Sequence, residues 1–297
     1  MLDKIKYYFF FNLFKNKKKL LWTLTNNLLS NSISIPSISV LTLSTDTTIG
    51  KKNEKIFVTN DSYQTWYILN DKNFHREFVQ KINDLTDKNT NYNFIDIGAN
   101  TGLLSKSLLK NLDNISSIFA VEPNQDNFFC LKNNLNMYKN VQVFKFALDL
   151  KDGEKKLFLD KNNKGNLSFN YEMMTLKEDK LNFMNSPEDY ELVDCKSVKN
   201  FFNEIKNDKK NIIKIDIQGY DEIIFQELPD DILKNTEILI IEITPLKTKK
   251  LNFDIFNSKL KMFSKYTNFK GDIISLDQIN KSVRMTTGES IDLIFLK

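Results

Sequence analysis

Glycine is scarce in this sequence, so the places where it does occur are informative. The chain has 8 glycines in 297 residues, less than half of the usual share of about 7%. Two of them, Gly98 and Gly102, stand close together in FIDIGANTG, directly after an apolar run. Glycine costs backbone entropy wherever its freedom is not needed. We therefore expect the backbone at these two positions to require it.

Cysteine and histidine are almost absent, which excludes several kinds of site. With 2 cysteines and 1 histidine, no Cys/His cluster has zinc-ligand spacing and no disulfide framework is expected. Cys130 and Cys195 are interpreted as buried, reduced thiols of a cytoplasmic protein. A hydrolase would have to use His75, which lies in the amphipathic helical pattern NFHREFVQKI. We expect a structural role for this histidine.

Long apolar runs are also missing. The N-terminal segment mixes aromatic and basic residues, and its longest uncharged apolar run is Tyr7 to Phe11, whereas a membrane span needs about 20 residues. No small-residue cleavage site follows, so a signal peptide is not indicated. We expect residues 1–50 to be a helical extension and linker that packs on its own domain. Contact with an anionic membrane surface or with a partner remains the alternative.

Neither sign of charge dominates. The net charge is +4, from 42 basic and 38 acidic residues, which is too small an excess for a dedicated nucleic-acid binder. The hydrophobic share of 41% and the charged share of 27% are those of a globular domain. One large domain over residues 51–297 is expected, with no nucleic-acid partner.

Strands and helices alternate from about residue 73. Helical spacing of apolar residues in 74–85, 104–112 and 128–135 separates short apolar strands: NFIDI, IFAVE, VQVFKFAL, NIIKIDI and EILIIEI. Apolar strands of this kind are typical of a parallel sheet covered on both faces, joined by right-handed crossovers. Residues 150–210 interrupt the pattern as a less regular insert. KIFVTND and TWYILND predict two strands before the alternation begins.

Near the C-terminus, GDIISL and IDLIFL predict terminal strands that pair antiparallel. The expected fold class is α/β, a Rossmann-like doubly wound, mostly parallel seven-stranded sheet with an antiparallel terminal strand and an N-terminal extension.

Carboxylates mark the ends of the predicted strands. In an open parallel sheet, ligands bind beyond the carboxyl ends of the strands, and an unpartnered buried charge is costly. Five acids at equivalent ends therefore indicate a shared polar rim for a ligand: Asp96, Glu122, Asp149, Asp216 and Glu242.

The loop FIDIGANTG indicates a nucleoside ligand. Gly98 and Gly102 would let the backbone turn sharply and approach the ligand, and the next helix offers free N–H groups. The spacing G-x-x-x-G differs from the nicotinamide fingerprint, and the chain has no phosphate-binding P-loop. Glu122 ends the following strand and can accept both hydroxyls of a ribose. Together with Asp96, which would face a positively charged amino-acid tail, this pattern suits a cationic nucleoside cofactor.

These motifs resemble the class I S-adenosylmethionine-dependent methyltransferases, and more closely the FkbM family. The resemblance covers about residues 90–245, in order FIDIGANTG, VEPNQDNFFCLKNN, FALDLKDG, IIKIDIQGYDEIIF and LIIEITP. One motif departs from the family pattern D-x-E-G-x-E. Here the sequence has Asp216, Gln218, Gly219 and Asp221, so one acid is replaced by an amide and another is shorter.

The resemblance implies S-adenosyl-L-methionine as cofactor. Its methionine end would be lined by Asp96, Gly98, Asn100, Thr101 and Gly102. Glu122 would bind the ribose, and Asn124 and Asp149 would lie near the adenine, although both are also ordinary turn residues. The segment KGNLSF, with Gly165 and Ser168, resembles a loop near the cofactor.

For the chemistry, methyl transfer to a hydroxyl needs alignment and a general base. We predict Asp216 as this base, with Asp221 and Glu242 behind it. Lys214 points away from its apolar strand neighbours and is expected to pair with one of these acids. A divalent cation held by the acids is an alternative that we do not favour.

The resemblance implies O-methylation of a hydroxyl on a small molecule or a glycan, and we expect the acceptor to be a sugar hydroxyl in a glycan. Two alternatives remain. An N-methyltransferase of nucleic acid or protein would have an Asn-Pro-Pro-Tyr type segment where this chain has DIQGY. A binding or scaffold protein would keep the fold without turnover.

Overall fold

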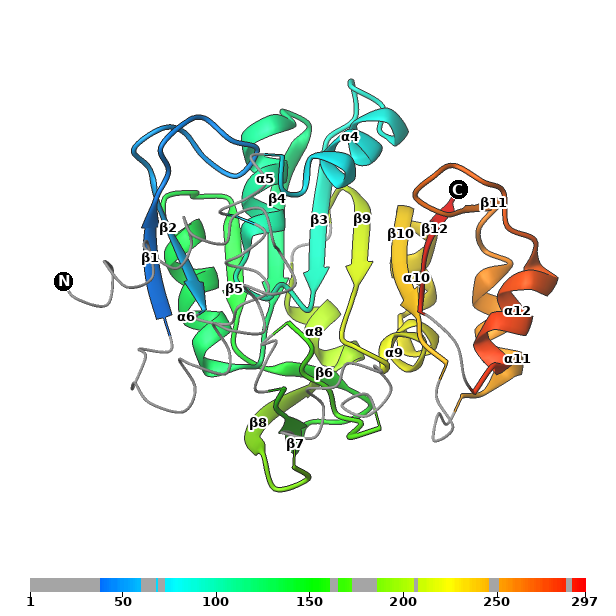
Figure 1. The fold of residues 1–297 in the computed structure, drawn as a ribbon. Coiled ribbons are helices and arrows are strands. Elements are labelled where there is room, and N and C mark those ends of the chain that lie inside the picture. The colour runs from blue at the N-terminus through cyan, green and yellow to red at the C-terminus, as the bar shows by residue number, and fades with distance from the viewer. Residues whose placement is uncertain are drawn as a thin grey trace, which may run out of the picture.

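The computed structural model describes residues 38–59, 68, 73–160, 165–172, 186–205, 208–245, 251–286 and 290–297. Within this part of the chain, a 7-stranded sheet runs through the centre in the order β11-β12-β10-β9-β3-β4-β5 (Figure 1). Its strands are β3 (Tyr92–Ile97), β4 (Ile115–Val121), β5 (Val141–Phe144), β9 (Lys210–Ile215), β10 (Thr236–Ile243), β11 (Lys265–Thr267) and β12 (Ile291–Leu296).

One strand of the sheet runs against the others. β3 pairs parallel with β4 and β9, and the parallel pairing extends to β5 and β10. β12 is antiparallel to both β10 and β11 and sits between them. The expected fold class, a doubly wound and mostly parallel sheet with an antiparallel C-terminal strand, is confirmed.

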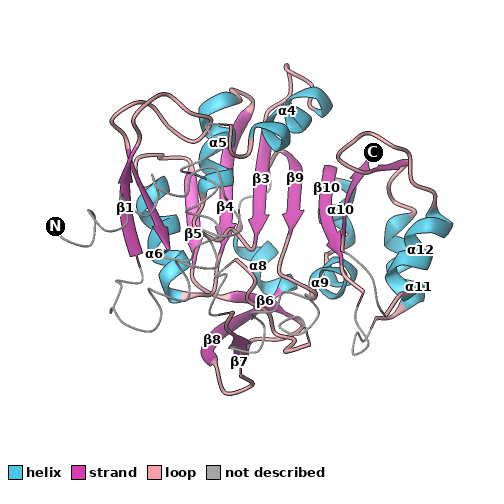
Figure 2. Cartoon of the chain, in the orientation of Figure 1, coloured by secondary structure: helices cyan, strands magenta, loops and turns pink. Residues whose placement is uncertain are grey.

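Helices cover both faces of this sheet (Figure 2). On one face pack α4 (Arg76–Leu85), α5 (Leu103–Asn111) and α6 (Gln125–Leu135). On the other face pack α8 (Val198–Glu204), α9 (Asp221–Glu227), α10 (Asp230–Lys234), α11 (Phe253–Leu260) and α12 (Leu276–Arg284). Side chains alternate across a strand, so Phe94 of β3 joins the first core while Ile95 and Ile97 join the second.

A second sheet lies beyond the carboxyl ends of the parallel strands (Figure 1). It has the order β6-β8-β7 and is formed by β6 (Ala147–Asp149), β7 (Gly153–Phe158) and β8 (Tyr190–Ser197). The single strand predicted for VQVFKFAL is therefore wrong, because β5 ends at Phe144 and β6 pairs with β8 in the other sheet. Local apolar spacing cannot reveal this change, since the partner strand is distant in the sequence.

The strand predicted for GDIISL is also wrong. This segment leads into α12, where the Ser275 hydroxyl accepts the N–H of Gln278 and the Gln278 side chain accepts the N–H of Ser275. Such a capping box favours a helix start over a strand. The antiparallel partner of β12 on this side is β11, which lies just before the predicted segment.

A hairpin precedes the main sheet. β1 (Ile38–Thr42) and β2 (Lys55–Thr59) pair antiparallel, so the domain boundary predicted at residue 50 falls in the turn between two paired strands. The strand predicted for KIFVTND is confirmed, while most of TWYILND and the predicted N-terminal helix lie outside the described residues. In the described part of the chain, no helix has the length and apolar character of a membrane span.

Candidate active site

The loop after β3 turns through three residues with left-handed backbone angles. The φ angles are 82° at Gly98, 51° at Asn100 and 76° at Gly102, so the expectation that these glycines are required by the backbone is confirmed. The expectation that they leave room for a ligand needs correction. A Cβ on Gly98 would lie 2.0 Å from the carbonyl oxygen of Asp216, and one on Gly102 would lie 2.5 Å from Leu131. Neighbouring parts of the protein already fill that room.

Glu122 stands at the end of β4 and holds this loop in place. Its carboxylate accepts the backbone N–H of Asn100 at 2.9 Å and of Asn124 at 3.0 Å, and the side-chain amide of Asn127 at 3.4 Å. Burial raises the pKa of Glu122 to about 7, although these three donors oppose the shift. The carboxylate therefore lies in a strongly desolvated position at the sheet edge.

Asp96 and Lys214 form a buried ion pair between β3 and β9. Lys214 Nζ lies 3.3 Å from Asp96 Oδ1, 3.3 Å from Asp216 Oδ2 and 3.3 Å from the carbonyl oxygen of Gly98. The hydroxyl of Ser105 donates to the other Asp96 oxygen at 2.7 Å. The pairing predicted for Lys214 is confirmed.

Opposite charges in this cluster counteract the effect of burial on the pKa values of Lys214 and Asp96. Burial alone would lower the pKa of Lys214, but Asp216 and Asp96 raise it above its ordinary value. Burial raises the pKa of Asp96, while Lys214 opposes that shift. The ammonium group is therefore charged at neutral pH and balances the nearby carboxylates.

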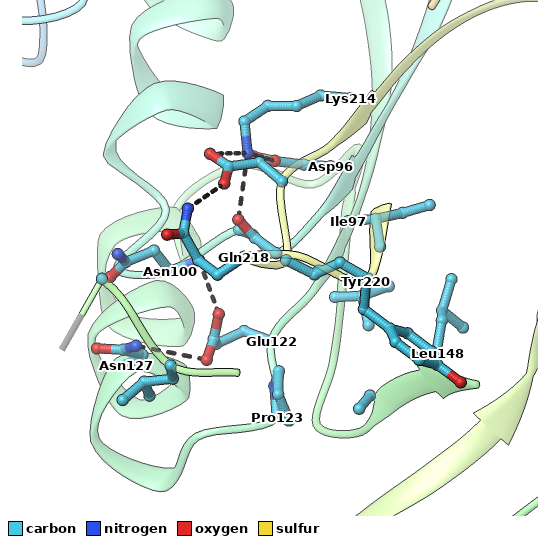
Figure 3. Close-up of a pocket in the computed structure, with 18 of the residues that line it drawn as sticks. Asp96, Ile97, Asn100, Glu122, Pro123, Asn127, Leu148, Lys214, Gln218 and Tyr220 are labelled. Carbon is cyan, nitrogen blue, oxygen red and sulfur yellow. Dashed lines mark hydrogen bonds and ion pairs between the residues drawn. The ribbon is translucent and has the colours of Figure 1, made fainter. Parts of the chain in front are cut away.

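A cavity joins these elements (Figure 3). At its polar end, near the top of the view, lie Lys214 and Asp96, and at its apolar end lie Tyr220 and Leu148. Among the residues predicted from the sequence, five line it: Asp96, Gly98, Asn100, Glu122 and Asp216. Gly165, from the KGNLSF segment, lines it as well.

The other residues predicted to bind the cofactor have structural contacts and do not line the cavity. Thr101 is fully buried, and Gly102 begins α5. Asn124 caps α6 by accepting the N–H of Asn127 at 3.0 Å. Asp149 accepts the hydroxyl of Tyr220 at 2.7 Å and also binds Lys155. Their role in cofactor binding stays a prediction.

The three predicted catalytic acids differ in position. Asp221 is fully buried and accepts the backbone N–H of Ile217 at 3.1 Å and of Gly219 at 3.0 Å. Burial, and then Glu242, raise its pKa well above the ordinary value. Glu242 accepts the amide of Gln218 at 3.3 Å and is not in the cavity wall. Only Asp216 of the three lines the cavity, and 42% of its side chain is exposed.

Sequence reasoning missed several residues of the cavity. The main one is His75, which was expected inside a helix but is the N-cap of α4, with a φ of 65°. Burial and the charge of Lys214 lower its pKa to about 3. Tyr220, Asn127 and Gln218 also line the cavity. No local pattern could identify them, because the approach of α4 and of the loop after β9 is a property of the tertiary structure.

Among the described residues, no group of three or more His, Cys, Asp or Glu side chains could hold a metal ion. The absence of metal from the predicted mechanism stays a prediction.

Comparison with solved structures gives matches of low identity. A precorrin-6y C5,15-methyltransferase from Geobacter metallireducens is 11% identical, with a TM-score of 0.32 over 73% of this chain and 87% of that one. An FkbM methyltransferase from Methylobacillus flagellatus is 16% identical, with a TM-score of 0.37 over 69% and 43%. Trm5b from Pyrococcus abyssi is 6% identical, with a TM-score of 0.39 over 88% and 56%. All three TM-scores are too low to bear on function.

The family model is the decisive comparison. No curated protein matches the chain. The model described as the methyltransferase FkbM domain matches residues 96–270, which is more than half of the chain and includes the end of β3 and the whole of β4, β9 and β10. The chain belongs to the FkbM methyltransferase family.

Proposed function

We propose that the protein is an S-adenosylmethionine-dependent O-methyltransferase that acts on a sugar hydroxyl of a glycan. One observation carries the proposal. The cavity joins the loop after β3 and Glu122 to Asp216, so a nucleoside-binding edge and an open carboxylate face the same space. A methyltransferase for hydroxyl groups needs both features.

The residues present fit the cofactor. The side-chain oxygen of Asn100 is buried in the cavity wall and accepts no hydrogen bond, so it suits a donor from a ligand. Glu122, in its charged form, can accept the two ribose hydroxyls. Pro123, which follows Glu122 in the cavity wall, offers an apolar surface for an adenine ring. These contacts support S-adenosylmethionine as the methyl donor.

The chain's own part in the chemistry centres on Asp216. When bound, S-adenosylmethionine supplies a methyl group on a positively charged sulfur. The amide of Gln218 donates to Asp216 Oδ1 at 2.8 Å, and Lys214 lies 3.3 Å from Oδ2. These two contacts orient the carboxylate, which would take the proton of the acceptor hydroxyl while the methyl group passes from the sulfur to the hydroxyl oxygen and S-adenosylhomocysteine is left.

Features at the apolar end support a sugar as acceptor. Phe169 and Tyr220 line the cavity there, with ring centroids 5.6 Å apart and edge-to-face geometry. Lys155 lies 4.4 Å from the centroid of each ring. The apolar faces of the two aromatic rings suit the C–H face of a sugar ring, and the nearby Lys155 ammonium can donate to sugar hydroxyls.

The position of Gln218 argues against the alternative in which the acids hold a divalent cation. Its amide nitrogen donates to both Asp216 and Glu242, so a neutral group bridges the two carboxylates that a cation would otherwise bridge. We propose that the reaction needs no divalent metal. Turnover should then be unchanged after dialysis against a strong chelator, whereas loss of turnover with recovery on adding Mg²⁺ would contradict this.

The function is tested by incubating the protein with S-adenosylmethionine labelled on its methyl group and a set of glycans, RNA and protein acceptors. We expect label on a glycan hydroxyl, and about a 100-fold or larger loss of turnover in Asp216→Asn. Calorimetry should give similar affinities of the wild type and of Asp216→Asn for S-adenosylhomocysteine. Label only on RNA or protein would favour an N-methyltransferase, and absence of cofactor binding would favour a scaffold.

A further inference from the structure

We propose that His75 binds the carboxylate at the amino-acid end of the cofactor by donating an imidazole N–H. The inference rests on the proposed function, because it assumes a cofactor of the S-adenosylmethionine type. It assigns a binding role to the single histidine of the chain, which no sequence motif indicates.

The position of His75 supports this role. It begins α4 and lines the cavity together with Asp96, Leu104 and Lys214. Its ring lies against Phe74, with centroids 3.9 Å apart, and Phe74 packs against the core cluster that contains Leu103. The imidazole is thus held at the polar end of the cavity, where an amino-acid tail would lie.

The donors at this end are largely used by the protein itself. The three hydrogens of the Lys214 ammonium are matched by three acceptors, on Asp96, Gly98 and Asp216. The two amide hydrogens of Gln218 are matched by Asp216 and Glu242. A bound carboxylate therefore needs a further donor.

His75 can supply that donor. In the described part of the chain, its imidazole makes no hydrogen bond, although it is only partly exposed and lines the cavity. A polar group that is mostly shielded from solvent usually has a partner. A zwitterionic tail would satisfy both sides, with its ammonium group near Asp96 and its carboxylate on the imidazole.

The protonation state of His75 leaves it one N–H to donate at neutral pH. Burial and Lys214 lower its pKa to about 3, so the ring is uncharged at neutral pH and carries one N–H. Asp96 and Asp216 are the acids that line the same end. The N–H of the uncharged ring can donate to an anion.

The test compares two ligands that differ in the amino-acid tail, which carries the proposed contact. S-adenosylhomocysteine carries the amino-acid tail, and 5′-methylthioadenosine has the same nucleoside and sulfur without it. Calorimetry would be done on the full chain with His75→Gly, which removes the ring without strain at a positive φ, and with His75→Gln, which keeps a donor. Glu77→Ala, on the exposed side of α4, is the matched control.

We expect His75→Gly to weaken S-adenosylhomocysteine about tenfold or more and 5′-methylthioadenosine less than twofold. His75→Gln should recover part of the loss, and Glu77→Ala should bind both ligands like the wild type. The imidazole NMR signals of His75 should also shift with the first ligand and stay in place with the second.

Three results would overturn the inference. Equal losses for both ligands in His75→Gly would mean that the histidine only supports the cavity wall. Unchanged affinity for S-adenosylhomocysteine would mean that the tail binds elsewhere. If the wild-type protein binds neither ligand, the proposed function fails together with the inference, whereas the first two results leave that function standing.

Discussion

The loops after β3 and after β9 use similar residues for different purposes. An acid lies near the start of each loop, Asp96 at the end of β3 and Asp216 directly after β9. Each loop also has residues with positive φ, including Gly98 in the first and Gly219 in the second. In the first loop, the backbone N–H of Asn100 is held by Glu122 from a neighbouring strand, and the loop faces the cavity. In the second, Asp221 turns inward and binds the N–H groups of its own loop. Glu122 and Asp221 both accept backbone N–H groups, but only Glu122 lines the cavity. The position of an acid relative to the cavity therefore reveals whether it can reach a ligand or serves the loop alone.

The two loops also touch, which couples them. The carbonyl oxygen of Asp216 occupies the space that a side chain at Gly98 would need. A change in either loop should therefore be transmitted to the other. A substitution at this contact is therefore expected to have the largest effect on both loops.

The largest effect is expected for Gly98→Ala. The added Cβ would lie 2.0 Å from the backbone oxygen of Asp216, and φ at this position is +82°. We therefore expect the free energy of unfolding to fall by more than about 3 kcal/mol and S-adenosylhomocysteine binding to be lost. Gly271→Ala is the control, because φ there is +94° but the nearest atom is the flexible end of Lys81 at 3.7 Å. Urea unfolding of both variants measures the difference. A similar, small cost for both would show that the loops are not in tight contact.

The next effect concerns Asp221. Asp221→Ala would leave two backbone N–H groups without their acceptor, so we expect a loss of about 2–5 kcal/mol in unfolding free energy. Asp221→Asn keeps one acceptor oxygen and should lose less. The affinity of both Asp221 variants for S-adenosylhomocysteine is measured well below their unfolding temperatures. We expect the fold-loss in this affinity to be smaller than the fold-loss in turnover caused by Asp216→Asn. Full stability with abolished turnover in Asp221→Ala would instead make Asp221 a catalytic residue.

A pH experiment sharpens the role of Glu122. Its pKa is raised from 4.5 to about 7 in the folded protein, so the folded state binds its proton more tightly than the unfolded chain does. The resulting stability is full below pH 4.5 and is lost as the pH rises to about 7, by up to about 3 kcal/mol.

Glu122→Gln replaces the titrating carboxyl by a neutral amide and so removes this pH-dependent contribution to stability. We expect the variant to gain stability over the wild type between pH 4.5 and 7, as measured by urea unfolding, while it binds the ribose more weakly above pH 7. His75 and Asp96 titrate in both proteins, so the difference isolates Glu122. Parallel pH curves for the two proteins would contradict the raised pKa.

The smallest effect is expected at the second sheet. Tyr220→Phe removes the hydroxyl that donates to Asp149 at 2.7 Å, and we expect a cost of about 1 kcal/mol. Asp149 also binds Lys155 of β7, so combining Tyr220→Phe with Lys155→Met should give a non-additive result in thermal unfolding. Additive costs would mean that the two contacts hold the second sheet independently.

The local elements of the core were predictable because each depends on neighbours in the sequence. Apolar runs identified β3, β4, β9 and β10, and the scarcity of glycine directed attention to Gly98 and Gly102, whose φ angles are indeed positive. The bend between β5 and β6 was not predictable, since it follows from pairing with β8. For the same reason, Asp221 could be recognised as an acid in a motif, but its inward orientation could not.

The sequence by itself determined the order of strands and helices, the turn after β3, the acids at the strand ends and the family, because these depend on residue spacing along the chain. Only the tertiary structure decided which of those acids face the cavity, what fills the space at the glycines, and that His75, the N-cap of α4, lines the same cavity as Lys214 from β9. These properties depend on contacts between segments that are far apart in the sequence, and such contacts leave no trace in local periodicity.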